Sequence, residues 1–439
     1  MQRVALLCGL MAVILVAGIM SQATIGEDVA ARTGKEAPTA QVRTVQPRPI
    51  APFLGKSVEW LVEAQHENGG WGGGSHAKQQ NRDPLDVTTD PTTTSFAAMA
   101  LLRSGHTPTS GSHQEALLKA TEHLIKVVED APVEGPKITD VTGTQPQAKL
   151  GQMVDTTMTT QFLARVAAEI PEDHELHPRV EQALAKCVKK LEASQNEDGS
   201  WNVGGGWAPV LQSSAGQTAL ELAQASGQKV DRDRLDKARD YQRKNFNAET
   251  GEVDASKGAG VALYAFSGAQ RGNAADSRAA DDVLEKAKKE GKVAQDAEVN
   301  EESLRRAGLN APTAAKLAQA KDQNDKQIDR LNDDNLLRGF GNNGGEEFVS
   351  FLLTSESMII AGGDKWAAWN DKMHGVLKKV QNPDGSWSGH HCITSPVFCT
   401  AAVVQCLTTD RDATLLEKIA AQAVETNEAV ASAESAGQP

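Results

Sequence analysis

The chain has 439 residues and carries 45 Lys and Arg against 58 Asp and Glu, so its formal net charge is −13. An acidic chain offers no cationic surface to hold a phosphate backbone or an anionic bilayer, which argues against nucleic acid and membrane surfaces as partners. Aromatic residues make up only 4% of the chain, although 39% of it is hydrophobic. We therefore expect a core built mainly from Ala, Leu and Val.

Residues 1–23 have the pattern of a secretory signal peptide. Arg3 precedes an apolar run from Val4 to Met20, and Ser21 and Ala23 are small residues of the kind found at signal peptidase sites. The apolar run is close to membrane-spanning length, so an uncleaved anchor is the alternative and the one membrane contact we expect. This pattern predicts an exported protein, periplasmic or extracellular. Residues 24–52 are rich in Ala, Thr, Gln and Pro, which predicts a flexible linker.

One short pattern occurs three times, each time after an amphipathic helix. Its copies are Gln65, Gly69 and Trp71; Gln195, Gly199 and Trp201; and Gln381, Gly385 and Trp387. Each copy is followed by a Ser/Thr-rich start to a second, more apolar helix. The repeating unit is therefore helix, Gly/Trp turn, helix.

Weaker copies of this unit fill the gaps between the three clear ones. They pair a helix at residues 114–129 with one at 155–170, a helix at 234–246 with one at 258–270, and a helix at 279–289 with one at 346–361. Together they make six hairpins over residues 53–408, enough to close into a ring. Within them, residues 274–340 are charged and poor in apolar anchors, which predicts a solvated helical insertion or a docking arm. Residues 409–439 form a C-terminal tail whose last part, from residue 420, has the composition of a disordered segment.

The Gln-x-x-x-Gly-x-Trp turn resembles the QW repeat of the squalene cyclase and prenyltransferase superfamily. The resemblance implies an all-α fold, an α/α toroid of six helical hairpins, in which the second helix of each hairpin lines a central cavity. In that family the Gln covers the end of the outer helix and the Trp stacks against it. The residues suit these roles, since Gly permits a left-handed exit from a helix and Trp buries a large apolar area with one polar N–H.

The sequence lacks the catalytic and zinc-binding motifs of this superfamily. Class II cyclases protonate their substrate with an Asp-x-Asp-Asp motif, which the chain does not contain, and they line the cavity with aromatic rings. Protein prenyltransferases bind zinc through Asp-x-Cys and a distant His, and the nearest segment is His390-His391-Cys392. Because a metal site needs three or four convergent ligands, we expect no metal and no other cofactor, with zinc at His391 and Cys392 as the lesser alternative.

Several carboxylates precede or begin the predicted inner helices and would share one rim of the ring. They are Asp86, Asp90, Asp155, Glu346, Glu347 and Glu356. As acids of a divergent terpenoid cyclase-like or a carbohydrate-active toroid enzyme, Asp86, Asp90, Asp155 and Glu356 are the candidates. Capping is the simpler interpretation, because Asp before a Thr-rich helix start satisfies free N–H groups and complements the helix dipole.

These observations favour a non-catalytic binding toroid that holds a small molecule or a protein in or near its central cavity. The enzyme remains the alternative. Because all inner helices run the same way, we expect their starts to meet at one end, together with His76 and the His390-His391 pair. Helix N-termini attract anions and hydroxyl groups, so this end is the predicted ligand site.

Overall fold

The computed structural model describes residues 45–203, 205–341 and 344–436. The predicted signal peptide, and the linker up to residue 44, lie outside the described residues. All regular secondary structure in the described part is helical, apart from three isolated bridges between single residues. No helix in this part has both the length and the apolar composition to cross a membrane.

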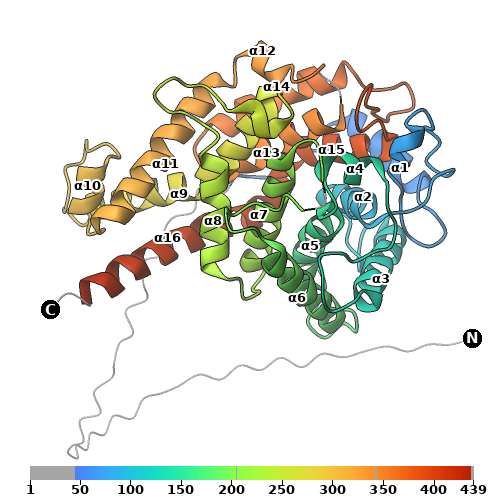
Figure 1. Ribbon diagram of the computed structural model, residues 1–439, viewed down its shortest axis with the longest axis horizontal. Helices are drawn as coiled ribbons and strands as arrows, with labels where there is room; N and C mark the ends of the chain where they lie inside the picture. The colour runs from blue at the N-terminus through green and yellow to red at the C-terminus, as the bar shows by residue number, and fades with distance from the viewer. Residues whose placement is uncertain (1–44, 204, 342–343, 437–439) are drawn as a thin grey trace, which may run out of the picture. The chain divides into compact units, whose positions relative to one another are not determined.

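Six helices form a closed inner ring (Figure 1). They are α2 (Pro91–Arg103), α5 (Val154–Ala167), α7 (Pro209–Ala225), α9 (Ala262–Lys289), α13 (Gly345–Ala361) and α15 (Pro396–Leu407). Each packs against the next in this order, and α15 packs back against α2. The closing contact includes Phe96 and Phe398, whose rings stack with centroids 4.7 Å apart. The predicted α/α toroid of six hairpins is confirmed.

Six outer helices pack against this ring. They are α1 (Pro52–Glu63), α3 (Gln114–Asp130), α6 (His177–Ser194), α8 (Arg232–Arg243), α11 (Ala311–Arg330) and α14 (Lys365–Lys378). Their sequences are amphipathic because only one face is covered, as in α3, which buries residues three or four apart. The inner helices are covered on all sides, so every residue of α5 and α13 is buried.

Glutamine side chains join several neighbouring inner helices. Gln161 of α5 donates to the carbonyl of Ala215 in α7, at 3.1 Å. Gln217 of α7 repeats this contact on Arg271 of α9, and Gln405 of α15 on Phe96 of α2. A buried amide needs a partner, and the backbone of the next helix supplies it. These bonds fix the register between helices whose small side chains would otherwise specify it weakly.

The three Gln/Gly/Trp turns make the same hydrogen bonds. Each indole Nε1 donates to a carbonyl ten positions earlier, on Leu61, Leu191 and Leu377, at 2.7 to 2.8 Å. Each Gln side chain donates both to the carbonyl of the turn's own Gly and to the first turn of the next outer helix. The three glycines have φ values between 83° and 94°. Each turn therefore joins its own hairpin to the next one.

The assignment of the fifth hairpin from sequence was wrong. Helix α9 continues unbroken to Lys289, so residues 279–289 belong to an inner helix. The outer helix of the fifth hairpin is α11, which lies inside the segment predicted as an insertion, together with the short α10 (Glu301–Arg306) and α12 (Asp334–Leu337). The error has a physical cause: the buried face of α11 has few apolar residues, Ala314, Leu317 and Ala320, and its other buried residues are polar, including Gln323 and Gln327, which accept from Asn273 of α9.

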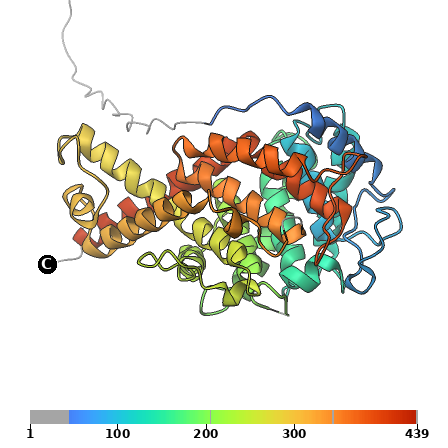
Figure 2. The same ribbon diagram turned by 90° about the horizontal axis from the view of Figure 1, so that it is seen from above.

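The C-terminal segment is also more ordered than its composition predicted. It forms η3 (Thr409–Asp412) and then α16 (Ala413–Ala436), which packs against α7, α9 and α13. Leu416 and Ile419 are buried in this contact and anchor the helix. Figure 2 shows α16 running beside α9 and α11 at one side of the ring.

Candidate functional site

The starts of the inner helices meet at one end of the ring, which we call the mouth. Here the backbone N–H of Thr92 donates to Asp155 from the neighbouring hairpin, and that of Thr394 donates to Gln145 at 2.7 Å. Gln145 begins α4 (Gln145–Leu150), a short helix at the mouth. Asp155, Thr92 and Thr394, which the sequence predicted to gather at one end, therefore do lie at the same end.

Asp90 and Asp155 act as helix caps at the mouth. Asp90 accepts N–H groups from Thr93, at 2.8 Å, and from Gly73, at 2.7 Å. Asp155 lies in the first turn of α5 but caps α2, accepting from Thr92 and from the Gln147 side chain. Burial raises the pKa of both carboxyls, that of Asp90 to about 7 with a further contribution from Asp155. Their acceptor positions are used within the protein.

Asp86 and Glu356 lie away from this pair. Asp86 is exposed in the loop before α2, where it accepts a hydrogen bond from the Asn81 side chain. Glu356 is not near a helix start as predicted, because α13 begins at Gly345 and Glu356 falls in its fourth turn. It lies instead at the opposite end of the ring, towards the ends of the inner helices.

At that opposite end Glu356 is buried in an arginine cluster. Its carboxylate pairs with Arg103, with Arg165 at 2.7 Å and with Arg271 at 3.2 Å. Asp412 of η3 joins the cluster through Arg103 and Arg165. Burial alone would raise the pKa of Asp412, but the two guanidinium groups lower it to about 2. The pKa of Glu356 is lowered for the same reason. These carboxylates stay ionised and have no proton to donate.

Another group of side chains at the mouth has the composition of a metal site. One ligand atom each from Glu346, His391 and Cys392 lies within 4.8 Å of the others. Both ring nitrogens of His391 are buried without a hydrogen-bond partner in the described part of the chain. Cys392 has a φ of 57°, a left-handed conformation that non-glycine residues seldom adopt. Thiolate, imidazole and carboxylate together are ligands typical of zinc.

The protonation of these groups follows from their burial. Burial raises the pKa of Glu346 to about 7 and that of Cys392 to about 11, to which the nearby Glu346 also contributes. Burial lowers the pKa of His391. Neighbouring Glu347 accepts from the Tyr264 hydroxyl, at 2.8 Å, and from two backbone N–H groups, so it braces the site. A bound divalent cation would lower the pKa values of Glu346 and Cys392, which burial raises, because metal ligands bind in their deprotonated form.

Sequence reasoning found His391 and Cys392 but not their third partner. Glu346 belongs to the fifth hairpin and the other two to the sixth, so only the closed ring brings them together. The available signal was that both hairpins place these residues at the start of an inner helix.

Lys149 and Trp207 form a second feature of the mouth, which the sequence did not reveal. Lys149 is only 2% exposed, and its Nζ lies 3.1 Å from the centroid of the Trp207 indole. Among the described residues its ammonium group has no hydrogen bond or ion pair. Trp207 is 60% exposed, and its backbone N–H donates to the Lys149 carbonyl at 3.0 Å. The imidazole of His76 meets the indole edge-on, with centroids 6.4 Å apart.

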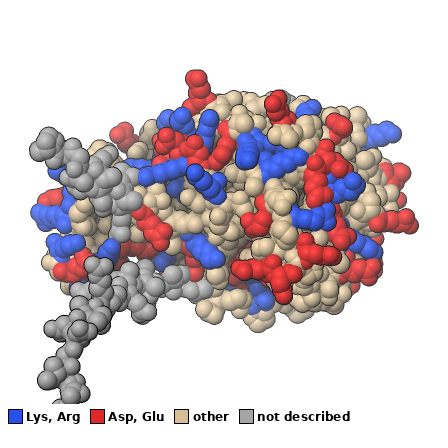
Figure 3. Space-filling model, turned by 90° about the horizontal axis from the view of Figure 1, so that it is seen from below, with Lys and Arg blue, Asp and Glu red and all other residues tan. Residues whose placement is uncertain are grey.

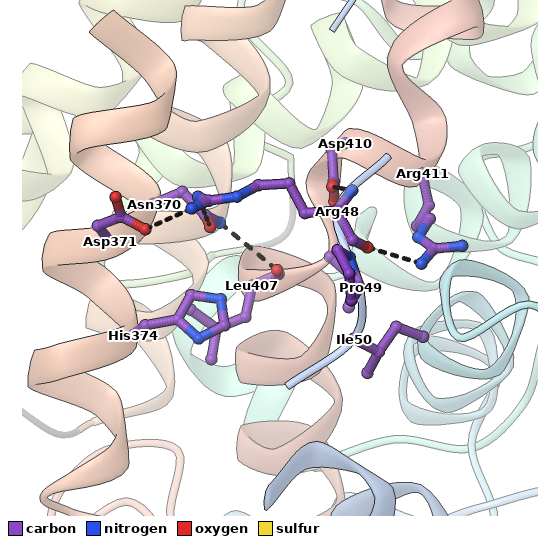
Figure 4. A pocket seen from close by; sticks show the side chains of 10 residues that line it. Arg48, Pro49, Ile50, Asn370, Asp371, His374, Leu407, Asp410 and Arg411 are labelled. Carbon is purple, nitrogen blue, oxygen red and sulfur yellow. Dashed lines mark hydrogen bonds and ion pairs between the residues drawn. The ribbon is translucent and has the colours of Figure 1, made fainter. Parts of the chain in front are cut away.

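Two surface pockets lie elsewhere. One, of about 310 Å³, is lined by residues 48–50, α14 and the segment after α15 (Figure 4). Arg48 crosses it to bind Asn370 and Asp371, and its backbone N–H donates to Asp410, so this end of the predicted linker is fixed to the ring. The other, of about 270 Å³, lies between α11 and the end of α13. Neither includes the residues of the mouth.

Comparison with known proteins gives no family. No family model matches the chain, and no curated protein matches it. Among solved structures it is similar to the type II terpene cyclase MstE from Scytonema. A variant of MstE with geranylgeranyl dihydroxybenzoate is 14% identical, with a TM-score of 0.40, over 82% of this chain and 97% of that one. The apo form is 13% identical, with a TM-score of 0.32 over the same shares.

Proposed function

We propose that this chain is an exported toroid, related to squalene cyclases and prenyltransferases, that binds a ligand at its mouth without catalysing a reaction. In this proposal a divalent transition metal ion, most simply zinc, is part of the binding site. The lesser alternative from the sequence thus replaces the expectation of no metal, because Glu346 supplies a third possible ligand beside His391 and Cys392. The observation that carries it is the convergence of Glu346, His391 and Cys392 from two hairpins.

The chemistry of the three side chains suits zinc. A tetrahedral zinc ion holds its ligand atoms roughly 3.5 Å apart, given bond lengths of about 2.0 to 2.3 Å. Small rotations would bring the three atoms from their present separation to that distance. Among the described residues neither nitrogen of His391 has a hydrogen-bond partner, although Nε2 lies 3.6 Å from Glu347 Oε2, so Nδ1 is the freer nitrogen to bind the ion. Three protein ligands would leave a fourth position for water or for a ligand in the mouth.

Absence of catalysis is inferred from how the candidate acids are engaged. Asp90 and Asp155 are engaged as caps, and Glu356 is ionised among arginines. Figure 3 shows acidic and basic side chains interspersed on one face of the molecule, which agrees with a partner other than a polyanion. These observations favour binding over acid catalysis.

Metal content tests the proposal directly. The mature protein, loaded with zinc and then dialysed, should retain about one equivalent by mass spectrometry. Cys392→Ser and Glu346→Gln should reduce the retained zinc strongly. Cys187→Ser is the matched control, because Cys187 is buried in α6 and distant in the ring. A wild-type protein that retains no zinc, or a Cys392→Ser variant that retains as much as wild type, would contradict the metal site.

One observation favours an enzyme as the second candidate. Glu346 is buried with a pKa near 7, which suits a general acid or base at neutral pH. A divergent terpenoid cyclase-like or carbohydrate-active enzyme would use it in this role. Turnover of a polyprenyl or glycan substrate that disappears in Glu346→Gln but survives metal removal would establish this alternative.

A further inference from the structure

We infer that the mouth binds a small monoanion that carries a carboxylate on a planar apolar group, with the carboxylate on Lys149 and the planar group on Trp207. This inference rests on the proposed function only in taking the mouth as the ligand site. It does not require the metal ion.

The environment of Lys149 is the first observation that supports a bound anion. Lysine residues with so little exposed surface are usually paired with an acidic group. Here Lys149 is 2% exposed, its ammonium lies over the indole of Trp207, and in the described part of the chain it has no hydrogen bond or ion pair. Glu346 is close enough for its pKa to be affected by Lys149, yet the two form no ion pair. A ligand carboxylate would supply the missing partner.

The exposure of the Trp207 indole is the second, independent observation. Large aromatic side chains are usually buried, but this indole is 60% exposed. Its position is fixed from below by Lys149 and along the backbone by the bond to the Lys149 carbonyl. Phe340, 67% exposed, adds a second aromatic ring at the mouth, 5.0 Å from His391. An ordered, exposed indole is a surface on which a planar group can stack.

The charges around Lys149 limit the ligand to a monoanion. Glu346 and Glu347 are adjacent in the first turn of α13 and bring two acidic side chains to the mouth, of which Glu346 interacts electrostatically with Lys149. A dianion such as phosphate would be repelled more strongly than a carboxylate. The exposed rings add favourable contact for an apolar group, which inorganic phosphate lacks.

Benzoate is a suitable probe, with benzamide as its neutral isostere. Titration by calorimetry and by tryptophan fluorescence should show benzoate binding at least about tenfold tighter than benzamide, the range for a charge-assisted bond. Lys149→Gln should remove this preference, and Trp207→Leu should weaken both ligands. Lys190→Gln is the matched control, because Lys190 is equally buried but donates to the carbonyls of Glu134 and Gly135. It should bind benzoate as wild type does.

The same titration in Cys392→Ser separates the two proposals. Benzoate binding that persists when zinc is lost supports the Lys149 site alone. Equal affinity for benzoate and benzamide, unchanged binding in Lys149→Gln, or phosphate binding tighter than benzoate would each overturn the inference. So would the absence of benzoate binding at millimolar concentration. Trp207→Leu changes an exposed side chain, so it remains informative if Lys149→Gln fails to fold.

Discussion

Replacing Trp201 by Ala tests how the ring is held together. The indole is completely buried, its Nε1 donates to the Leu191 carbonyl at 2.8 Å, and the Trp201 backbone N–H donates to the Ser213 hydroxyl. Removing a buried aromatic side chain costs about 3 to 5 kcal/mol, and the unpaired carbonyl adds about 1 kcal/mol. Trp207→Ala is the control, with an expected change below about 1 kcal/mol because this indole is exposed.

Gly216 of α7 packs directly against the Trp201 ring, so a second substitution can test the same contact. A Cβ at this position of α7 would lie 2.5 Å from the Trp201 ring, so Gly216→Ala should destabilise the wild-type protein by about 1 to 3 kcal/mol. In the Trp201→Ala background the ring is gone, and the same change should stabilise by up to about 1 kcal/mol through helix propensity. Urea unfolding followed by circular dichroism measures all four proteins. A loss below about 1 kcal/mol in Trp201→Ala, or additive effects of the two substitutions, would refute the packing argument.

Further predictions concern charge and export. The folded pKa of Asp90, about 7, lies above its unfolded value of about 3.9, so its contribution to stability falls as pH rises from about 4 to 7. Asp90→Asn retains a capping oxygen and should remove this part of the pH dependence of urea unfolding; an unchanged profile would contradict it. Glu356→Gln should cost about 3 to 5 kcal/mol in the same assay, because it leaves buried guanidinium groups without their carboxylate; a loss below about 1 kcal/mol would argue against the cluster. Residues 1–52 fused to alkaline phosphatase should export active enzyme, and an inactive cytoplasmic fusion would contradict the signal peptide.

Much of the fold was predictable because its signals are local. The three turns can be recognised from Gln, Gly and Trp at fixed spacing, and each forms its hydrogen bonds within one hairpin and with the start of the next. Helix α11 was not predictable in the same way. Its apolar face consists mostly of alanines, and a polar sequence attached by small residues resembles a solvated helix. Residues 279–289 were misassigned because one long helix and two shorter ones have the same periodicity.

The site was less predictable because it depends on ring closure. Asp90 and Asp155 could be predicted as caps from the Thr-rich starts that follow them. The sequence could not show that Asp155, in the first turn of α5, caps the neighbouring helix α2. The meeting of Glu346 with His391 and Cys392 requires two hairpins to be placed side by side. Lys149 lies in a six-residue helix for which the sequence showed no periodic pattern.

The dipoles of the inner helices explain the sign of most buried charges at the two ends of the ring, and Lys149 is the exception. The inner helices run in one direction, so their starts favour acids and their ends favour cations. Asp90, Asp155 and Glu346 lie at the starts, and Arg103 and Arg165 lie at the ends, as the dipoles require. A cation at the mouth has the wrong sign for the inner helices, and Lys149 is only 2% exposed and has no ion pair with any residue that the structure describes. The dipoles of the inner helices therefore do not explain Lys149, which lies in the last turn of the short α4. An anion bound against it would satisfy both the ammonium group and the helix starts around it.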